Sequence, residues 1–172
     1  MSEADGRSVL QSYCIHTSVE GGATLPSPTG FGSVPRDTPE TQFLLKRGFA
    51  LEQVERISRL ELPVDAASFA VSLAAATESA GSDYRLVRWS GRTPDEWLAG
   101  IAVLHQRMST DAPWAGLEFT EEKWDEDRVR AADDSRDASP RTMLVVAAEH
   151  VPTGTLAGFT ELYVPPEVGR PV

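Results

Sequence analysis

Histidine and cysteine are the residue types that most often bind metals or act as nucleophiles, and this chain of 172 residues has few of them. His16, His105 and His150 are far apart and lack the short spacing typical of a metal site. Cys14 lies in an apolar run, where a cysteine is more often a small core residue than a nucleophile. No metal is therefore expected, and the single cysteine excludes an intrachain disulfide. The carboxylates are therefore the candidates for acid–base chemistry.

The carboxylates give the chain a formal net charge of -10 and a pI near 4.7. The segment from Glu118 to Asp137 alone carries nine acidic and four basic residues. Phosphates and anionic lipids need basic partners, so this charge argues against nucleic acid and membranes as partners. No apolar run approaches the ~20 residues of a membrane span, and the first residues lack a signal-peptide pattern. We therefore expect a cytoplasmic protein.

The first half of the chain is expected to begin with a strand and a loop. The apolar residues of 7–16 fall on both faces, which predicts a strand buried on both sides. Glycine and proline are frequent in 20–37 and predict an irregular loop. Within it, the sequence TGFG at 29–32 is either a plain loop or a phosphate-binding turn, although no helix opens directly from it.

A short helix and a second strand are expected next. Thr38 is a good N-cap, Pro39 suits the first helical position, and Gly48 is a typical helix stop. The apolar residues of 50–62 predict a strand with a bulge, because their alternation is imperfect.

Residues 63–83 are expected to form a connector helix, with Asp65 as its N-cap and Gly81 as its stop. Helical spacing relates the four residues of its apolar stripe: Phe69, Leu73, Ala76 and Ala80.

The second half predicts the order strand, helix, helix, strand, strand. The strand covers 83–91, and the first helix begins at a capping box formed by Thr93 and Glu96. Charged residues spaced for i,i+4 ion pairs predict the second helix within 120–137. These pairs are Lys123 with Asp127, Glu126 with Arg130, and Arg130 with Asp134. Two β-rich runs around the turn VPTG predict a hairpin over 141–167.

This order of elements resembles the GNAT superfamily of acyltransferases. The second half resembles the opening of such a domain, and the first half resembles the close of one. The sequence TQFLLKRGF is similar to the family's late helix, A-x-x-F-Y-x-x-x-G-F, with Phe43, Gly48 and Phe49 in register. The stretches MSTDAP and GFTELYVP are similar to tandem members, which carry two such domains in one polypeptide.

The resemblance implies an α/β fold with a mixed α+β sheet, divided into three segments. Residues 1–62 would be the closing part of a first domain, 63–83 a linker helix, and 84–172 the opening part of a second domain. The implied activity is acetyl transfer from acetyl-CoA to an amine of a small-molecule acceptor.

Two departures from the family pattern bear on chemistry. The motif Q/R-x-x-G-x-G/A, whose backbone N–H groups bind the pyrophosphate of acetyl-CoA, has no match in the sequence. The chain is therefore expected to be an inactive fragment that lacks this loop. The family often has a proton-donating tyrosine four residues before the helix-ending glycine, and Leu44 stands at this position.

The resemblance also implies two candidate site residues. Glu161, on the second hairpin strand, would face the acceptor cleft and activate the amine; alternatively it is an ordinary solvated strand residue. Asp111, in a loop between the two helices, would bind a cationic acceptor; alternatively it is a turn residue that bonds its own backbone. The alternative function is a non-catalytic GNAT-like binding module.

The strands at 7–16 and 155–164 would each leave an open sheet edge, and exposed edges recruit other strands. We expect the two halves to join in one permuted sheet, or the chain to associate with itself. In the joined form, Val9, Tyr13 and Ile15 would share one core with Leu144, Val146 and Phe159.

Overall fold

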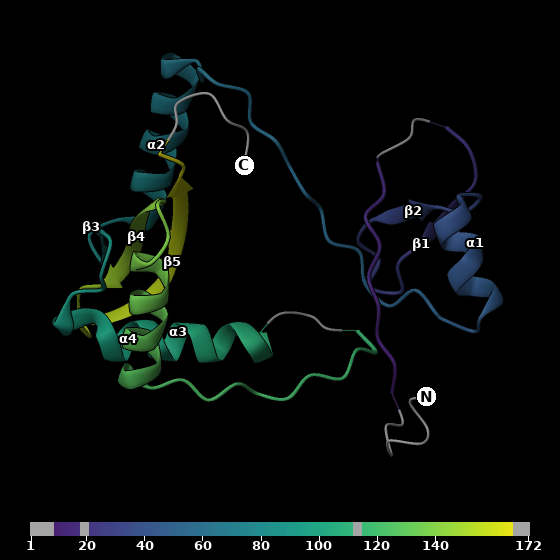
Figure 1. The fold of residues 1–172 in the computed structure, drawn as a ribbon. Helices are drawn as coiled ribbons and strands as arrows, with labels where there is room; N and C mark the ends of the chain where they lie inside the picture. The colour runs from purple at the N-terminus through teal and green to yellow at the C-terminus, as the bar shows by residue number, and fades with distance from the viewer. Residues whose placement is uncertain (1–8, 18–20, 112–114, 167–172) are drawn as a thin grey trace. The chain divides into compact units, whose positions relative to one another are not determined.

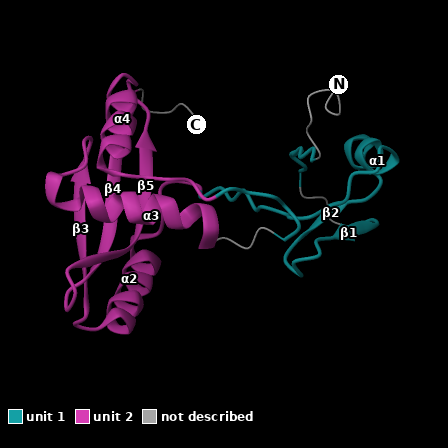
Figure 2. Cartoon of the chain, turned by 90° about the horizontal axis from the view of Figure 1, so that it is seen from below, with its two compact units in different colours: residues 1–60, 112–120 teal, residues 61–111, 121–172 magenta. Residues whose placement is uncertain are grey.

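The computed structural model describes residues 9–17, 21–111 and 115–166. The chain divides into two compact units, the first within 1–60 and 112–120 and the second within 61–111 and 121–172 (Figure 2). The assignment of the three sequence segments to two GNAT-like domains and a linker stays a prediction.

The first unit contains a short hairpin where an irregular loop was expected. Strand β1 (Thr24–Pro26) pairs antiparallel with β2 (Ser33–Pro35). The turn between them is closed by a hydrogen bond from the Ser27 N–H to the Gly32 carbonyl (3.1 Å). Gly30 and Gly32 have φ angles of 78° and 77°, which glycine adopts at little cost. The loop prediction is wrong here because the sequence TGFG closes a turn, and edge strands tolerate proline.

The short helix after this hairpin is confirmed as α1 (Pro39–Lys46). Its N-cap is Thr38, whose Oγ1 accepts a hydrogen bond from the Thr41 N–H (3.4 Å). At the other end Gly48 has a φ of 82°, and the Phe49 N–H donates back to a carbonyl of the last turn (3.1 Å). Local chemistry therefore defines both ends of this helix.

Both strands predicted around α1 are wrong for the described residues. The segments 9–17 and 49–61 have no regular secondary structure, and residues 7 and 8 lie outside the described part. The side chains expected in a core are exposed: Val9, Tyr13, Cys14 and Ile15. A strand obtains its hydrogen bonds from a neighbouring strand, and no described strand pairs with either segment.

The second unit contains the connector helix and the five predicted elements in the predicted order (Figure 1). The connector is α2 (Ala66–Ala80), which Asp65 caps. The three strands, which all pair antiparallel in the order β3-β4-β5, are β3 (Tyr84–Ser90), β4 (Thr142–His150) and β5 (Thr155–Val164). The helices between β3 and β4 are the 3-10 turn η2 (Asp95–Trp97), α3 (Leu98–Asp111) and α4 (Glu126–Asp137). The α+β fold class is thereby confirmed.

The capping box predicted at the start of η2 does not form. Pro94 occupies the N-cap position, and no side chain caps this end. The Thr93 hydroxyl donates instead to Asp133 of α4 (3.2 Å), and the Thr93 N–H donates to the same carboxylate (3.1 Å). A tertiary partner therefore replaces the local one.

The sheet of the second unit has two different faces, because side chains alternate along each strand. On the helix-covered face, Met143, Val145 and Ala147 of β4 are buried. They lie in or beside a core formed with α3, α4 and β5, whose buried members are Leu98, Ile101, Ala102, Val129, Ala147 and Leu156. The other face, which we call the open face, carries Leu144 and Leu162, which are 40% and 60% exposed.

These two faces contradict the predicted joined core. Leu144 and Val146 lie on the open face, whereas Phe159 packs against the core on the helix-covered face. The described strands form two separate sheets, β1-β2 and β3-β4-β5, so the two halves do not join in one permuted sheet.

Candidate functional site

The candidate carboxylate Glu161 lies on the helix-covered face, near the end of β5. It is opposite Val145 in the sheet, and Tyr163 is opposite Met143. Because Val145 and Met143 are buried under the helices, the alternation directs Glu161 and Tyr163 to the same side. The side chain of Glu161 is 20% exposed, so it is not the outward-facing strand residue of the alternative prediction.

Both carboxylate oxygens of Glu161 have partners. Its Oε1 lies 3.4 Å from Nη2 of Arg136 in α4, and its Oε2 accepts a hydrogen bond from the Tyr163 hydroxyl (3.0 Å). Burial, followed by the hydrogen bond to Glu161, raises the pKa of Tyr163. These contacts fix the orientation of the carboxylate, since an arginine and a phenol both donate to it.

Arg136 is positioned in turn by Asp133, a carboxylate with no solvent exposure. The Arg136 Nη1 lies 3.2 Å from Asp133 Oδ1, and the Arg130 Nη1 lies 3.3 Å from Oδ2. With the two hydrogen bonds from Thr93, four donors surround this one buried carboxylate. A chain of polar contacts thus connects the start of η2 through α4 to Glu161. We call Thr93, Asp133, Arg136, Glu161 and Tyr163 the polar chain.

The sequence did not predict the polar chain. The i,i+4 spacing in α4 predicted pairs of Arg130 with Glu126 and with Asp134, but the observed partner of Arg130 on this helix is Asp133, three residues away. Arg130 also bonds Asp95, which precedes α3. The missed signal is that Asp133 and Val129 fall on one face of α4, and both are buried. A buried aspartate needs cations nearby.

His105 of α3 packs against aromatic side chains on the face of the sheet that carries Glu161. Its ring stacks on Trp124 with centroids 4.3 Å apart, and meets the Phe159 ring edge-on at 5.0 Å. Burial lowers the pKa of His105; the negative charge of Glu161 opposes this shift, and the positive charge of Arg136 adds to it. His105 is thus a neutral, packed side chain at pH 7.

Asp111 is not part of this constellation. It is the last residue of α3 rather than a loop residue, and it is exposed. Its Oδ1 lies 3.8 Å from Arg107 Nη1 and accepts a hydrogen bond from the Thr110 hydroxyl (3.4 Å). The helix continues through Asp111 because these side chains support its last turn. No contact between Asp111 and Glu161 is found in the described part of the chain.

The space beside the polar chain is small. A cavity of about 20 Å³ is lined by Gly91, Asp133, Arg136, Asp137 and Met143. A volume of this size holds about one water molecule. This cavity alone is therefore too small for a substrate.

A larger depression of about 350 Å³ lies in the first unit, next to the TGFG turn. Its lining is Pro28, Thr29, Phe31, Glu52, Ala115 and Gly116. The carboxylate of Glu52 accepts a hydrogen bond from the Gly116 N–H (3.1 Å). Among the described lining residues Glu52 alone is charged, and its negative charge does not suit a phosphate, so the depression gives no support to the phosphate-binding alternative for TGFG.

Acetyl-CoA needs free backbone N–H groups at a helix N-terminus to hold its pyrophosphate. At the starts of α1, α2 and α4 a side chain already occupies one of these donors, whereas no side chain caps η2 before α3. Asp65 accepts from the Ser68 N–H at the start of α2 (2.8 Å), and Asp125 accepts from the Arg128 N–H at the start of α4 (2.8 Å). The hydrogen bonds from Ser68 lower the pKa of Asp65, which keeps it ionised. Two carboxylates would repel a phosphate, so these helix ends do not fit the cofactor.

The described residues contain no group of three or more His, Cys, Asp or Glu side chains placed to hold a metal ion. None of the described helices combines the length and the apolar character needed to cross a membrane.

Comparisons with known proteins found a similarity to a solved structure. No protein-family model matches the chain, and no curated protein matches it significantly. Among solved structures, the chain is similar to a tandem GNAT protein from the clavulanic acid biosynthesis pathway, determined without AcCoA. The identity is 24% and the TM-score is 0.38, over 51% of this chain and 23% of that one. The chain thus spans about a quarter of the length of that protein.

Proposed function

We propose that the chain is part of an acyl-CoA-dependent N-acetyltransferase, which transfers an acetyl group from acetyl-CoA to an amine of a small cytoplasmic molecule. One observation carries the proposal: β3, α3, α4, β4 and β5 follow one another in the order that the GNAT resemblance implies, with α3 and α4 packed on the sheet. The polar chain supplies a carboxylate on this scaffold, at the position the resemblance assigns to the acceptor side.

In this proposal Glu161 is the candidate catalytic residue and Arg136 a positioning residue. Glu161 would receive a proton from the acceptor ammonium, directly or through a water. The ion pair with Arg136 and the hydrogen bond from Tyr163 hold the carboxylate in one orientation, so that it meets the amine with little loss of conformational freedom. Asp111, exposed at the end of α3, remains a proposed contact for the positive charge of the acceptor.

We propose that the residues that bind the cofactor pyrophosphate lie outside the described part of the chain, because the sequence has no Q/R-x-x-G-x-G/A motif and side chains cap the starts of α1, α2 and α4. We therefore expect that the 172-residue chain does not bind acetyl-CoA tightly. Isothermal titration checks this expectation, and a micromolar or tighter dissociation constant would contradict it.

The catalytic proposal is tested on a polypeptide that continues beyond Val172 and binds acetyl-CoA. Release of coenzyme A thiol is followed with a panel of amines, and a reaction without amine measures the thiols of the protein itself. We expect amine-dependent thiol release that falls at least about a hundredfold in Glu161→Gln, the usual range for removal of a general base. Glu78→Gln on the exposed side of α2 is the matched control and should keep full activity.

A non-catalytic GNAT-like module is the second candidate, and it is favoured by the two partners that already occupy Glu161. Under this alternative the longer polypeptide binds a ligand or a partner but releases no thiol with any amine. Equal thiol release by the parent and by Glu161→Gln would instead retain the transferase and remove Glu161 from its site.

A further inference from the structure

The helix α2 is an apolar helix with no core of its own. Its 15 residues include no buried one, and Phe69, Val71 and Leu73 are between 50% and 71% exposed. Isolated helices of this length are marginal in water, and most of their stability in proteins comes from packing. An apolar helix in this state needs a surface to cover.

The open face of the β3-β4-β5 sheet is a largely apolar surface in the same unit, although Arg88 of β3 also lies on it, and none of the described residues covers it. Large side chains from all three strands are exposed on it: Tyr84, Leu86, Leu144, Leu162 and Val164. Between them, Ala148 and Gly158 lie opposite each other, and a Cβ added at Gly158 would meet no atom within 4 Å. Because these two residues are small, the face is shallow at this point, which leaves room for a helix.

The connection between α2 and β3 suits such packing. Gly81, with a φ of 63°, ends the helix, and β3 begins at Tyr84 after Ser82 and Asp83. Connections of two to six residues are the usual ones between a helix and the strand on which it packs. The 15 residues of α2 span about 22 Å, and the seven residues of β3 span about 23 Å. The helix therefore matches the face in length as well as in polarity.

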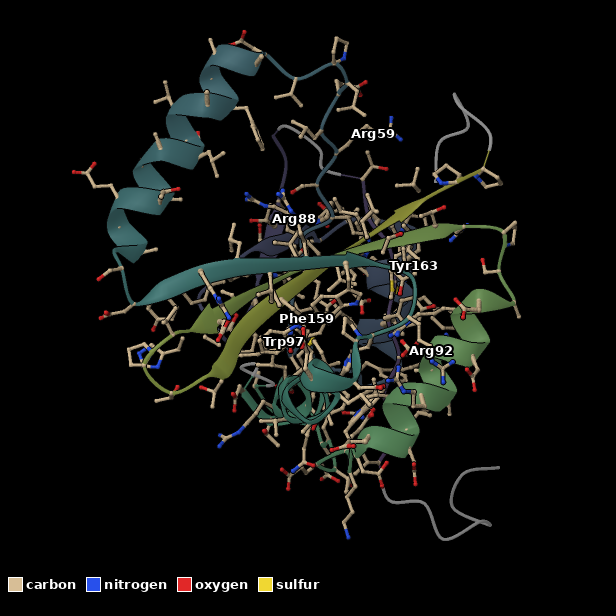
Figure 3. All side chains as sticks on the ribbon, turned by 90° about the vertical axis from the view of Figure 1, so that its left-hand side faces the viewer. Arg59, Arg88, Arg92, Trp97, Phe159 and Tyr163 are labelled. Carbon is tan, nitrogen blue, oxygen red and sulfur yellow. The ribbon has the colours of Figure 1, made fainter. Side chains whose placement is uncertain are left out.

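We propose that α2 closes onto the open face of its own sheet and turns the second unit into a three-layer α/β/α unit. In Figure 3, α2 lies on the side of the sheet away from α3 and α4, so closure needs a rotation about Gly81 and no passage around an edge. The stripe of Phe69, Leu73, Ala76 and Ala80 provides the contacting side of the helix. This proposal does not depend on acetyl transfer.

Closure fixes which residues meet. Leu73 is seven residues, about 10 Å, from the end of α2, and Arg88 is four residues, about 13 Å, from the start of β3. Val146 of the central strand is opposite Arg88. Leu73 should therefore lie near Val146. Val71 is two positions, and about 160° around the helix, away from Leu73. It would point to solvent.

Paired cysteines test this geometry in a Cys14→Ser background, which has no other thiol. We expect Leu73→Cys with Val146→Cys to form an intramolecular disulfide at a rate independent of protein concentration. The matched pair, Val71→Cys with Val146→Cys, should react at least about tenfold more slowly, because the second thiol points away. Equal rates, or no crosslink in the first pair, would overturn the proposal. A disulfide-linked dimer whose rate rises with concentration would overturn it in favour of a second copy on this face.

Thermal unfolding gives an independent measurement. Phe69→Asp should lower the midpoint by at least about 4 °C, since it places a charge against the sheet. Val71→Asp should leave it unchanged. Equal midpoints in the two variants would show that α2 stays away from the face and would refute closure.

Discussion

The buried carboxylate of Asp133 should be the most sensitive polar position of the second unit. The substitution Asp133→Asn keeps the shape of the side chain but removes its charge and replaces one acceptor oxygen by a donor. Four donors from Thr93, Arg130 and Arg136 surround the carboxylate at 3.1 to 3.3 Å. At least one arginine would then face an amide N–H rather than an oxygen.

The expected decrease in the free energy of unfolding depends on how deeply each partner is buried. Removing one member of a buried ion pair costs about 3–5 kcal/mol, because the other charge is left without compensation. The side chains of Arg130 and Arg136 are 20% and 21% exposed, so water compensates part of this loss. We therefore expect the free energy of unfolding to fall by about 3 kcal/mol, a large share of the stability of an ordinary domain.

Urea unfolding followed by tryptophan fluorescence measures this loss. The matched control is Asp134→Asn, one residue along the same helix, where the carboxylate is 64% exposed and pairs with Arg92 at the surface. Figure 3 shows Arg92 beside α4. The control should unfold like the parent, because exposed pairs contribute little. A change below about 1 kcal/mol in Asp133→Asn, or equal losses in both variants, would show that the carboxylate does not hold the helix.

Three further predictions concern the polar chain and His105. Thr93→Val should lower the free energy of unfolding by about 1 kcal/mol while Thr93→Ser should not, since the hydroxyl is the part of the side chain that bonds Asp133; equal urea midpoints would contradict this. Glu161→Gln should lower the raised pKa of Tyr163 without restoring its usual value, because burial remains; an unchanged spectrophotometric titration of the tyrosines would disprove the contact. Because burial lowers the pKa of His105, the unfolded chain binds more protons. The free energy of unfolding should be at its maximum above the unfolded pKa of about 6.5 and should decrease as the pH falls below it. An equally steep decrease in His105→Gln would exclude this residue as the cause.

The parts of the fold that the sequence predicts are those with local causes. Helix α1 is predicted because Thr38, Pro39 and Gly48 define its ends through contacts within a few residues. The hairpin of β4 and β5 is predicted because two β-rich runs surround a short turn. The strands expected at 7–16 and 50–62 fail because a strand depends on a partner elsewhere in the chain, and apolar alternation says nothing about whether that partner exists.

The candidate site shows the same division. Glu161 and Tyr163 share one face of the sheet because side chains alternate along a strand, so their hydrogen bond has a local cause. That Arg136 reaches Glu161 depends on how α4 crosses the sheet, which no local rule supplies. Thr93 makes the point most clearly. The sequence around Thr93 matches a good capping box, yet its hydroxyl and N–H both donate to Asp133, a buried aspartate forty residues away. A neutral cap gains about 1 kcal/mol at a wet helix end, whereas an unsatisfied buried carboxylate costs several times as much.

The sequence of β4, TMLVVAAEH, is apolar at both odd and even positions, which is the pattern of a strand buried on both sides. The structure covers only one side: Met143, Val145 and Ala147 lie under α3 and α4, while Leu144 is exposed on the open face. On a solvated side, a leucine and a valine gain little hydrophobic stabilisation. The unused half of the pattern therefore indicates that a second layer belongs on the open face. The helix immediately before β3 is as uncovered as that face, is matched to it in length, and is joined to it by three residues.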